Sequence, residues 1–308
     1  MSRIHEALKK AEQENALEFT NATISGKTSF ESVTPSPEKP LRRWAEVSPG
    51  SLHFDTLITR CAKADWKPDP HANGLLDSEV ALARNERFRM LRSRLYQIRS
   101  TRKLESVLVT SALPGEGKTF VASNLAIIIA RQPSAKVLLL DAHLRRPRLH
   151  FALGAPSGPG LAEYLAEEAC VEEVVQYNNQ ANLCFISAGE RLANPGELLA
   201  GPRMNKLLES LYPVFDWIII DSSPVLLVSD PLVLADMVDG VLQVVAAGST
   251  DREAAQNASR EFQDKRLLGV VLNGGSSVTR STQNMSAAGT NAQGHIGTFG
   301  GKTPSRLT

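Results

Sequence analysis

The chain has 308 residues, of which 42% are hydrophobic and 22% charged, and its formal net charge at pH 7 is +1. This length allows one large domain with appendages or two small domains, and the near-zero charge does not favour nucleic acid or a strongly anionic membrane as a partner. Three scattered cysteines without a CxxC pair are typical of a reducing cytosol. No apolar run approaches the ~18 residues of a membrane span, and we expect no signal peptide at the start.

The first part of the chain carries few signals of a folded core. Residues 1–19 show helical spacing of apolar and charged side chains, so we expect an amphipathic helix that either docks on a partner or frays. Residues 20–76 are rich in serine, threonine and proline, which predicts a linker that is mostly irregular. Within this range, the sequence of residues 52–66 is compatible with either a short strand or a short helix.

A long helix is predicted from Asp77 or Ser78 to about residue 100. Either residue can cap the helix, and apolar side chains follow at helical spacing. The other surface is rich in arginine, and Glu86, Arg89 and Arg92 are spaced three apart, so they share a narrow ridge. From spacing alone, we expect such a run of charged side chains to be a solvent-exposed face of the helix.

From residue 106 the sequence alternates between short apolar runs and helical patterns. Strands are predicted at 107–111, 136–141, 183–187, 217–221, 241–246 and 267–272, and helices at 117–131, 160–177, 203–212, 229–237 and 252–264. Regular alternation predicts an α/β fold with a mostly parallel sheet and helices on both faces. The ligand of such a sheet binds at the carboxyl ends of the strands.

The first strand-to-helix turn carries a phosphate-loop pattern, Ala-Leu-Pro-Gly-Glu-Gly-Lys-Thr at 112–119, with a small alanine in place of the first glycine. The two later glycines permit a tight turn whose backbone N–H groups converge beside the positive end of the next helix, which makes an anion site. We expect Lys118 to reach the outer phosphates and the Thr119 hydroxyl to bind Mg²⁺. Nucleotide contacts are predicted for Pro114, Gly115, Glu116, Gly117, Lys118, Thr119 and Phe120.

Two later strands end in carboxylates. One buried run ends in Asp141, followed by Arg145 and Arg146, and another ends in Asp221. A carboxylate at either place can bind a metal ion or accept a proton from an attacking hydroxyl, and an arginine there can neutralise phosphate charge. Asn273 closes the last predicted strand and could bind an adenine edge, although Asn-Gly is also an ordinary turn.

These segments resemble the bacterial tyrosine kinases (BY-kinases) of exopolysaccharide biosynthesis, over about residues 77–273. Residues 111–119, 137–147 and 218–224 are similar to the family's Walker A, Walker A′ and Walker B segments, and 194–199 and 230–231 also match. The resemblance implies a P-loop NTPase fold, bound ATP and Mg²⁺, and transfer of the γ-phosphate to protein tyrosine. The catalytic candidates are Lys118, Asp141, Asp221 and Arg145, and the metal candidates are Thr119, Asp141 and Asp221.

The resemblance also implies partners. Glu86, Arg89 and Arg92 fit the family's Glu-x-x-Arg-x-x-Arg helix, which implies a contact between the subunits of a ring. Residues 2–11 are similar to the start of free-standing members associated with exopolysaccharide gene clusters. The implied partner is a membrane-spanning chain-length determinant, a polysaccharide co-polymerase. The implied location is therefore cytoplasmic, peripheral at the inner face of the plasma membrane.

The expected organisation has four parts. Residues 1–19 form the N-terminal helix, 20–76 the linker, 77–273 the BY-kinase-like P-loop domain, and 274–308 a tail. The tail is expected to be disordered because glycine, serine, threonine and asparagine dominate it and almost nothing in it can be buried.

Two departures from the family pattern bear on activity. His143 stands where the family's Walker A′ has its second aspartate, so one carboxylate is missing and a charged histidine could repel Mg²⁺. The family's C-terminal tyrosine cluster is absent, and the tyrosines of the chain are Tyr96, Tyr164, Tyr177 and Tyr212.

Three hypotheses follow. The first is an active kinase, and its alternative is a catalytically impaired, ATP-dependent assembly switch that regulates the co-polymerase. The third is a partition-type ATPase. Those proteins carry a second lysine at the start of the loop, where this chain has Leu113, so this hypothesis is disfavoured.

Overall fold

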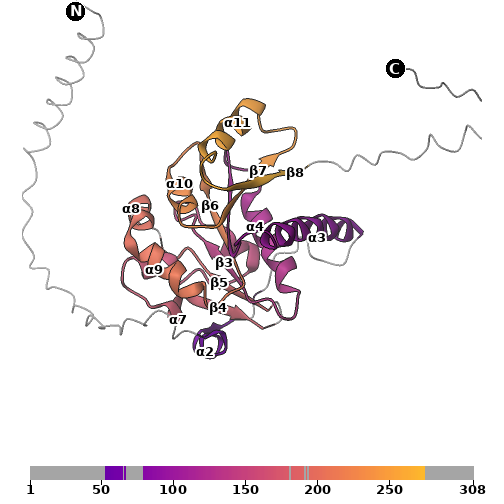
Figure 1. Cartoon of the computed structure of the whole chain (residues 1–308). Helices are drawn as coiled ribbons and strands as arrows, with labels where there is room; N and C mark the ends of the chain where they lie inside the picture. Colours follow the sequence, from indigo (N-terminus) through magenta and orange to yellow (C-terminus); the bar gives the residue numbers. More distant parts are fainter. Residues whose placement is uncertain are drawn as a thin grey trace, which may run out of the picture. The chain divides into compact units, whose positions relative to one another are not determined.

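A twisted sheet of eight strands lies at the centre of the part of the chain that the computed structural model describes, residues 53–64, 66, 79–179, 182–190, 192 and 194–274 (Figure 1). The strands are β1 (Ala62–Lys63), β2 (Ser106–Ser111), β3 (Val137–Asp141), β4 (Val175–Asn178), β5 (Leu183–Ile186), β6 (Trp217–Pro224), β7 (Gly240–Ala246) and β8 (Leu267–Asn273). They are ordered β1-β4-β5-β3-β6-β2-β7-β8. Neighbours are parallel except β4 and β5, which are antiparallel.

Helices pack against both faces of this sheet. The described helices are α2 (Phe54–Arg60), α3 (Glu79–Arg99), α4 (Lys118–Ala130), α5 (Leu149–Leu153), α6 (Leu161–Leu165), α7 (Val171–Val174), α8 (Pro195–Ala200), α9 (Pro202–Leu211), α10 (Asp230–Ala235) and α11 (Arg252–Glu261). Val107 and Val109 join the apolar cluster that includes α3, α4 and α5, whereas Leu108 joins the cluster of the other face. All three side chains are fully buried, which explains why this strand is an unbroken apolar run.

The predicted fold class is confirmed, since the sheet is mostly parallel and helices cover both of its faces. Each of the six predicted strands is present, and α3, α4, α9, α10 and α11 correspond to predicted helices. Along α3, Phe88 and Leu95 of the predicted apolar stripe are buried. The predicted caps Asp77 and Ser78, the N-terminal helix at 1–19 and residues 275–308 lie outside the described residues.

The single helix predicted at 160–177 is wrong. The structure has α6, then α7, and then β4. Glu167 has a left-handed backbone with φ of 66°, which a right-handed helix cannot include. The β-branched Val175 then starts the strand that pairs antiparallel with β5.

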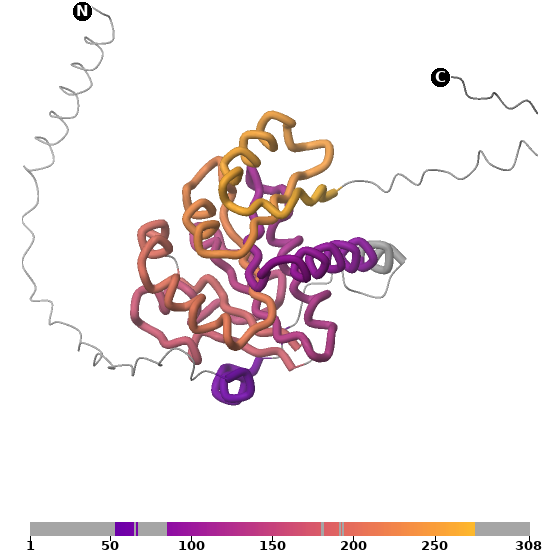
Figure 2. The backbone as a smooth tube through the Cα atoms, in the orientation of Figure 1, coloured from indigo at the N-terminus to yellow at the C-terminus, as the bar shows by residue number. Residues whose placement is uncertain are grey.

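The range predicted as a mostly irregular linker contains ordered elements. Residues 52–66 contain both a helix and a strand: α2, whose tube is drawn in indigo (Figures 1 and 2), and β1, which pairs with β4. Leu57 of α2 is fully buried, and the ring of Trp66 packs edge-on against Phe185 at a centroid distance of 5.8 Å. The limits of the domain itself remain a prediction.

None of the described helices combines the length and apolar character that a bilayer crossing requires.

Candidate nucleotide-binding site

The phosphate loop connects β2 to α4. Gly115 and Gly117 both have left-handed backbones, with φ of 84° and 89°, which other residues adopt only with strain. Gly117 is the N-cap of α4, so the free N–H groups of the first helical turn lie at the loop. Lys118 and Thr119 belong to that turn. The loop therefore has the backbone geometry of an anion site at a helix N-terminus.

The two predicted carboxylates are neighbours. Asp141 at the end of β3 is the register partner of Asp221 in β6, and both side chains are buried. Asp141 accepts hydrogen bonds from the backbone N–H groups of His143, at 3.0 Å, and Leu149, at 3.2 Å. The Thr119 hydroxyl donates to Oδ2 of Asp221 at 2.6 Å. The site thus joins the loop, β3 and β6.

The electrostatics of this pair favour an added cation. Burial raises the pKa of Asp141 to about 6, and burial together with the charge of Asp141 raises the pKa of Asp221 to about 7. The positive charge of Lys118 acts in the opposite direction on both. Oδ1 of Asp221 is buried and has no hydrogen-bond partner among the described residues. A buried, unpartnered carboxylate oxygen next to a hydroxyl and a second carboxylate fits Mg²⁺, which prefers oxygen ligands.

The protein supplies only part of a metal shell here. Within the described ranges, no group of three or more histidine, cysteine, aspartate or glutamate side chains is arranged to hold a metal ion. Thr119 and Asp221 would hold Mg²⁺ together with phosphate oxygens of a nucleotide, as is usual for this ion.

His143 is neutral at pH 7. Burial lowers its pKa to about 4, and the positive charge of Lys118 adds to that effect. The expectation that this histidine could repel Mg²⁺ is therefore corrected, since a neutral imidazole carries no charge. The missing negative charge of the second Walker A′ aspartate is not replaced.

The side chain of Arg145 forms an ion pair with Asp230 and is therefore not available to phosphate in this conformation. Its Nε and Nη2 bind the two carboxylate oxygens of Asp230 at 2.8 and 3.0 Å. The Asp230 side chain is fully buried, whereas that of Arg145 is 42% exposed. The pair ties the segment after β3 to the start of α10. A role in neutralising phosphate would require Arg145 to leave Asp230, and it remains a prediction.

The remaining predicted nucleotide contacts differ in exposure. Pro114 and Gly115 are exposed, while Phe120 is half-buried against Phe88 at a ring-centroid distance of 5.9 Å. Asn273 donates from its amide to the backbone carbonyl of Glu116 at 3.0 Å, so the end of β8 contacts the loop. Binding of adenine by Asn273 stays a prediction.

The side chain of Glu116 faces the protein interior, and a nucleotide contact through its backbone N–H stays a prediction. Its side chain is buried, and Oε2 accepts the backbone N–H of Leu113 at 2.6 Å while Oε1 accepts the hydroxyl of Thr250. Sequence reasoning missed Thr250. It lies 134 residues from Glu116, and no spacing in the sequence connects the two positions.

The predicted subunit-contact ridge is divided between two roles. Glu86 and Arg89 form an exposed ion pair at 3.2 Å. Arg92 donates to the backbone carbonyl of Ile128 at 2.9 Å, so it satisfies a carbonyl in the last turn of α4. A contact between subunits through Glu86, Arg89 and Arg92 remains a prediction.

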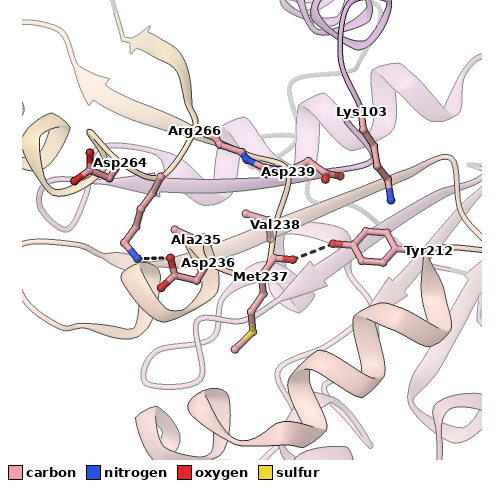
Figure 3. Close-up of a pocket in the computed structure, with 10 residues that line it drawn as sticks. Lys103, Tyr212, Ala235, Asp236, Met237, Val238, Asp239, Asp264 and Arg266 are labelled. Carbon is pink, nitrogen blue, oxygen red and sulfur yellow. Dashed lines mark hydrogen bonds and ion pairs between the residues drawn. The ribbon is translucent and has the colours of Figure 1, made fainter.

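The tyrosine side chains are engaged inside the described part of the chain. Tyr96 bonds Gln132 and Trp217, Tyr177 lies within hydrogen-bond distance of Asn182, and Tyr164 is only 8% exposed. The hydroxyl of Tyr212 lies 3.0 Å from the hydroxyl of Ser106. It also donates to the carbonyl of Met237 at 3.0 Å (Figure 3). None of these residues presents a free hydroxyl at the phosphate loop.

Tyr212 also lines a cavity of about 310 Å³ (Figure 3). Lys103, Asp239 and Arg266, which precede β2, β7 and β8, form part of its wall. Because these strands are parallel and the phosphate loop follows the end of β2, the cavity lies at the opposite edge of the sheet. It is not the nucleotide site.

Comparison with known proteins finds relatives that are named tyrosine-protein kinases. No protein-family model matches the chain. The chain is 34% identical over 204 residues to the tyrosine-protein kinase YwqD of Bacillus subtilis, an alignment that covers 66% of this chain and 86% of YwqD. It is 36% identical over 191 residues to the tyrosine-protein kinase etk of Escherichia coli K12, covering 61% of this chain but 26% of that longer protein.

Solved structures of tyrosine kinase domains also align with this chain. The kinase domain of the Escherichia coli tyrosine kinase ETK aligns with a TM-score of 0.60 and 31% identity, over 68% of this chain and 80% of that one. The VpsO kinase domain aligns with a TM-score of 0.57 and 32% identity, over 62% of this chain and 96% of that one. The identity and coverage, together with the loop and its paired carboxylates, show that the chain belongs to the bacterial tyrosine kinase family.

Proposed function

We propose that the chain binds Mg-ATP at the phosphate loop and transfers the γ-phosphate to a tyrosine hydroxyl of a protein. The observation that carries this proposal is the position of Thr119 between the loop and Asp221, whose second oxygen is buried without a partner in the described part of the chain. Backbone N–H groups of the loop and Lys118 bind the phosphates. Thr119 and Asp221 hold Mg²⁺, which neutralises phosphate charge when it is bound.

Asp141 is the proposed proton acceptor. In the transfer, the tyrosine oxygen forms a bond to the γ-phosphorus as the bond to the bridging oxygen of ADP breaks, and the hydroxyl proton passes to Asp141. The raised pKa of Asp141 suits a general base that works near neutral pH. Its hydrogen bonds to two backbone N–H groups fix the orientation of the carboxylate.

The acceptor tyrosine is proposed to belong to a partner. The four tyrosines of the chain are engaged or buried, and the chain has none after Tyr212. By its resemblance to the exopolysaccharide kinases, the partner is a membrane-spanning polysaccharide co-polymerase, and the protein acts at the inner face of the plasma membrane. Glu86 and Arg89, which are exposed on α3, are the proposed contact between subunits of a ring.

A second candidate is an ATP-dependent assembly switch that binds nucleotide without efficient transfer. His143 favours it, because a neutral imidazole stands where the family has a second carboxylate. Binding is common to both candidates, and only the transfer step separates them.

The test uses the purified full chain with Mg-ATP labelled at the γ-phosphate, with and without the cytoplasmic segments of the co-polymerase. Phosphotyrosine on the partner, detected by mass spectrometry and lost in Lys118→Met, is the expected result. Calorimetric binding of Mg-ATP without any phosphotyrosine supports the switch. No binding by a folded sample refutes both.

A further inference from the structure

Glu116 is a buried acid in the loop that is proposed to bind phosphate. Its side chain is 3% exposed, and both carboxylate oxygens accept hydrogen bonds from groups of the protein, the Leu113 N–H and the Thr250 hydroxyl. A carboxylate facing the loop's interior would repel phosphate. Here the carboxylate is turned into the protein and its oxygens are satisfied there.

Thr250 lies in the turn between β7 and α11 and connects three segments. Its hydroxyl oxygen accepts the backbone N–H of Ala246 at 3.0 Å while its hydrogen is donated to Glu116. The N–H of Ala247 in the same turn donates to the carbonyl of Asn273 at 2.7 Å, and the Asn273 amide donates to the Glu116 carbonyl at 3.0 Å. The loop, the turn and the end of β8 therefore form a closed set of hydrogen bonds.

The packing of these segments is close. A Cβ atom added to Gly117 would lie 2.0 Å from Nδ2 of Asn273, so any side chain at that position would displace the Asn273 amide. Glycine at 115 and 117 gives the isolated loop many conformations, and holding one of them costs entropy. The contacts of Glu116 restrict the loop before a nucleotide arrives, and such preorganisation raises affinity.

We propose that Glu116 and Thr250 are positioning residues that hold the phosphate loop in its anion-binding conformation. The proposal rests on the proposed binding of Mg-ATP at this loop. Thr250 acts through Glu116 and touches no phosphate itself. Nucleotide binding and the turn before α11 are consequently coupled, because the same carboxylate contacts both.

The first test compares three variants of the full chain by calorimetry with Mg-ATP and with Mg-pyrophosphate. Thr250→Val keeps the shape but loses the hydroxyl, and it is expected to weaken binding of both ligands about tenfold, as for a lost hydrogen bond to a charged group. Thr250→Ser keeps the hydroxyl and should restore wild-type affinity. Ser249→Ala changes an exposed neighbour in the same turn and should bind like the wild type.

The second test asks whether Thr250 acts through Glu116. Glu116→Asp is one methylene shorter and cannot reach both donors, so it should weaken binding to a similar extent even if Thr250→Val folds poorly. The double variant should bind no more weakly than Glu116→Asp alone. Additive losses, or wild-type affinity in both single variants, would overturn the proposal. Absence of binding by the wild type would instead refute the proposed function itself, and with it this inference.

Discussion

Asp221→Asn is expected to stabilise the nucleotide-free protein above neutral pH and to weaken its stabilisation by Mg-ATP. Asp221 is buried, its Oδ1 has no partner in the described ranges, and Asp141 lies beside it across the β3–β6 pair. Burial and the charge of Asp141 raise its pKa from 3.8 to about 7. The folded state therefore holds a proton that the unfolded chain has already lost.

This difference in pKa decides how the stability of the folded state changes with pH. Proton binding contributes stability that is complete below the unfolded pKa of 3.8 and is lost as the pH rises through the folded pKa of about 7. Asparagine is neutral at every pH, so at pH 8 the variant keeps the stability that the wild type loses when Asp221 gives up its proton. Its side-chain oxygen can still accept the hydrogen bond from Thr119, which limits any structural cost.

The magnitude has an upper limit set by the shift of the pKa. A folded-state pKa of about 7 against 3.8 in the unfolded chain corresponds to at most about 4 kcal/mol. Because Asp141 and Asp221 titrate as a pair, we take about half of this limit, about 2 kcal/mol, as the expected gain. For a domain of this size, this predicts a melting temperature about 4–8 °C higher at pH 8. The difference should shrink toward zero at pH 4.

Differential scanning calorimetry at pH 4 and pH 8, with and without Mg-ATP, measures both effects. Mg-ATP should stabilise the wild type at pH 8 more than it stabilises Asp221→Asn. Asp264→Asn, which alters an exposed carboxylate, is the matched control and should show neither effect. A variant less stable than the wild type at pH 8, or equally stabilised at both pH values, would refute the electrostatic argument.

Three further predictions follow from the geometry. Gly117→Ala should cost about 2 kcal/mol in urea unfolding, because alanine is strained at a φ of 89° and its Cβ would displace the Asn273 amide; unchanged stability would contradict the packing described. Asp230→Asn should cost about 1–3 kcal/mol, since it breaks a partly exposed ion pair with Arg145, and an unchanged urea midpoint would show that the pair contributes nothing. His143→Asp should raise the yield of phosphotyrosine with labelled ATP, and no change would refute the view that the missing carboxylate limits transfer.

The parts of the site that the sequence could predict are those made by neighbouring residues. The loop and the start of α4 are consecutive, so their spacing carries the chemistry. Asp141 ends β3, and Asp221 ends the strand predicted at 217–221, although β6 continues to Pro224. Because the carboxyl ends of parallel strands meet at one edge, the sequence placed both carboxylates at that edge. The adjacency of β3 and β6 was not predicted and is a finding of the structure.

Contacts that connect distant loops could not be predicted in this way. Thr250 reaches Glu116 across 134 residues and Asp230 reaches Arg145 across 85, and neither pair follows a period or strand-end rule. The helix predicted at 160–177 failed for a related reason, because pairing with β5 outweighs helical spacing once Glu167 ends the first helix. The local structure at these residues is decided by contacts with residues that are distant in the sequence.

His143 shows how a departure from a family pattern can change one step and leave another intact. In the proposed function, Mg-ATP is bound by the loop N–H groups, Lys118, Thr119 and Asp221, and the imidazole of His143 takes no part in that binding. Transfer would additionally require a well-placed metal ion, and a neutral imidazole does not replace the second carboxylate beside that ion. Affinity alone therefore cannot separate the kinase from the assembly switch, whereas phosphotyrosine yield in the His143→Asp variant can.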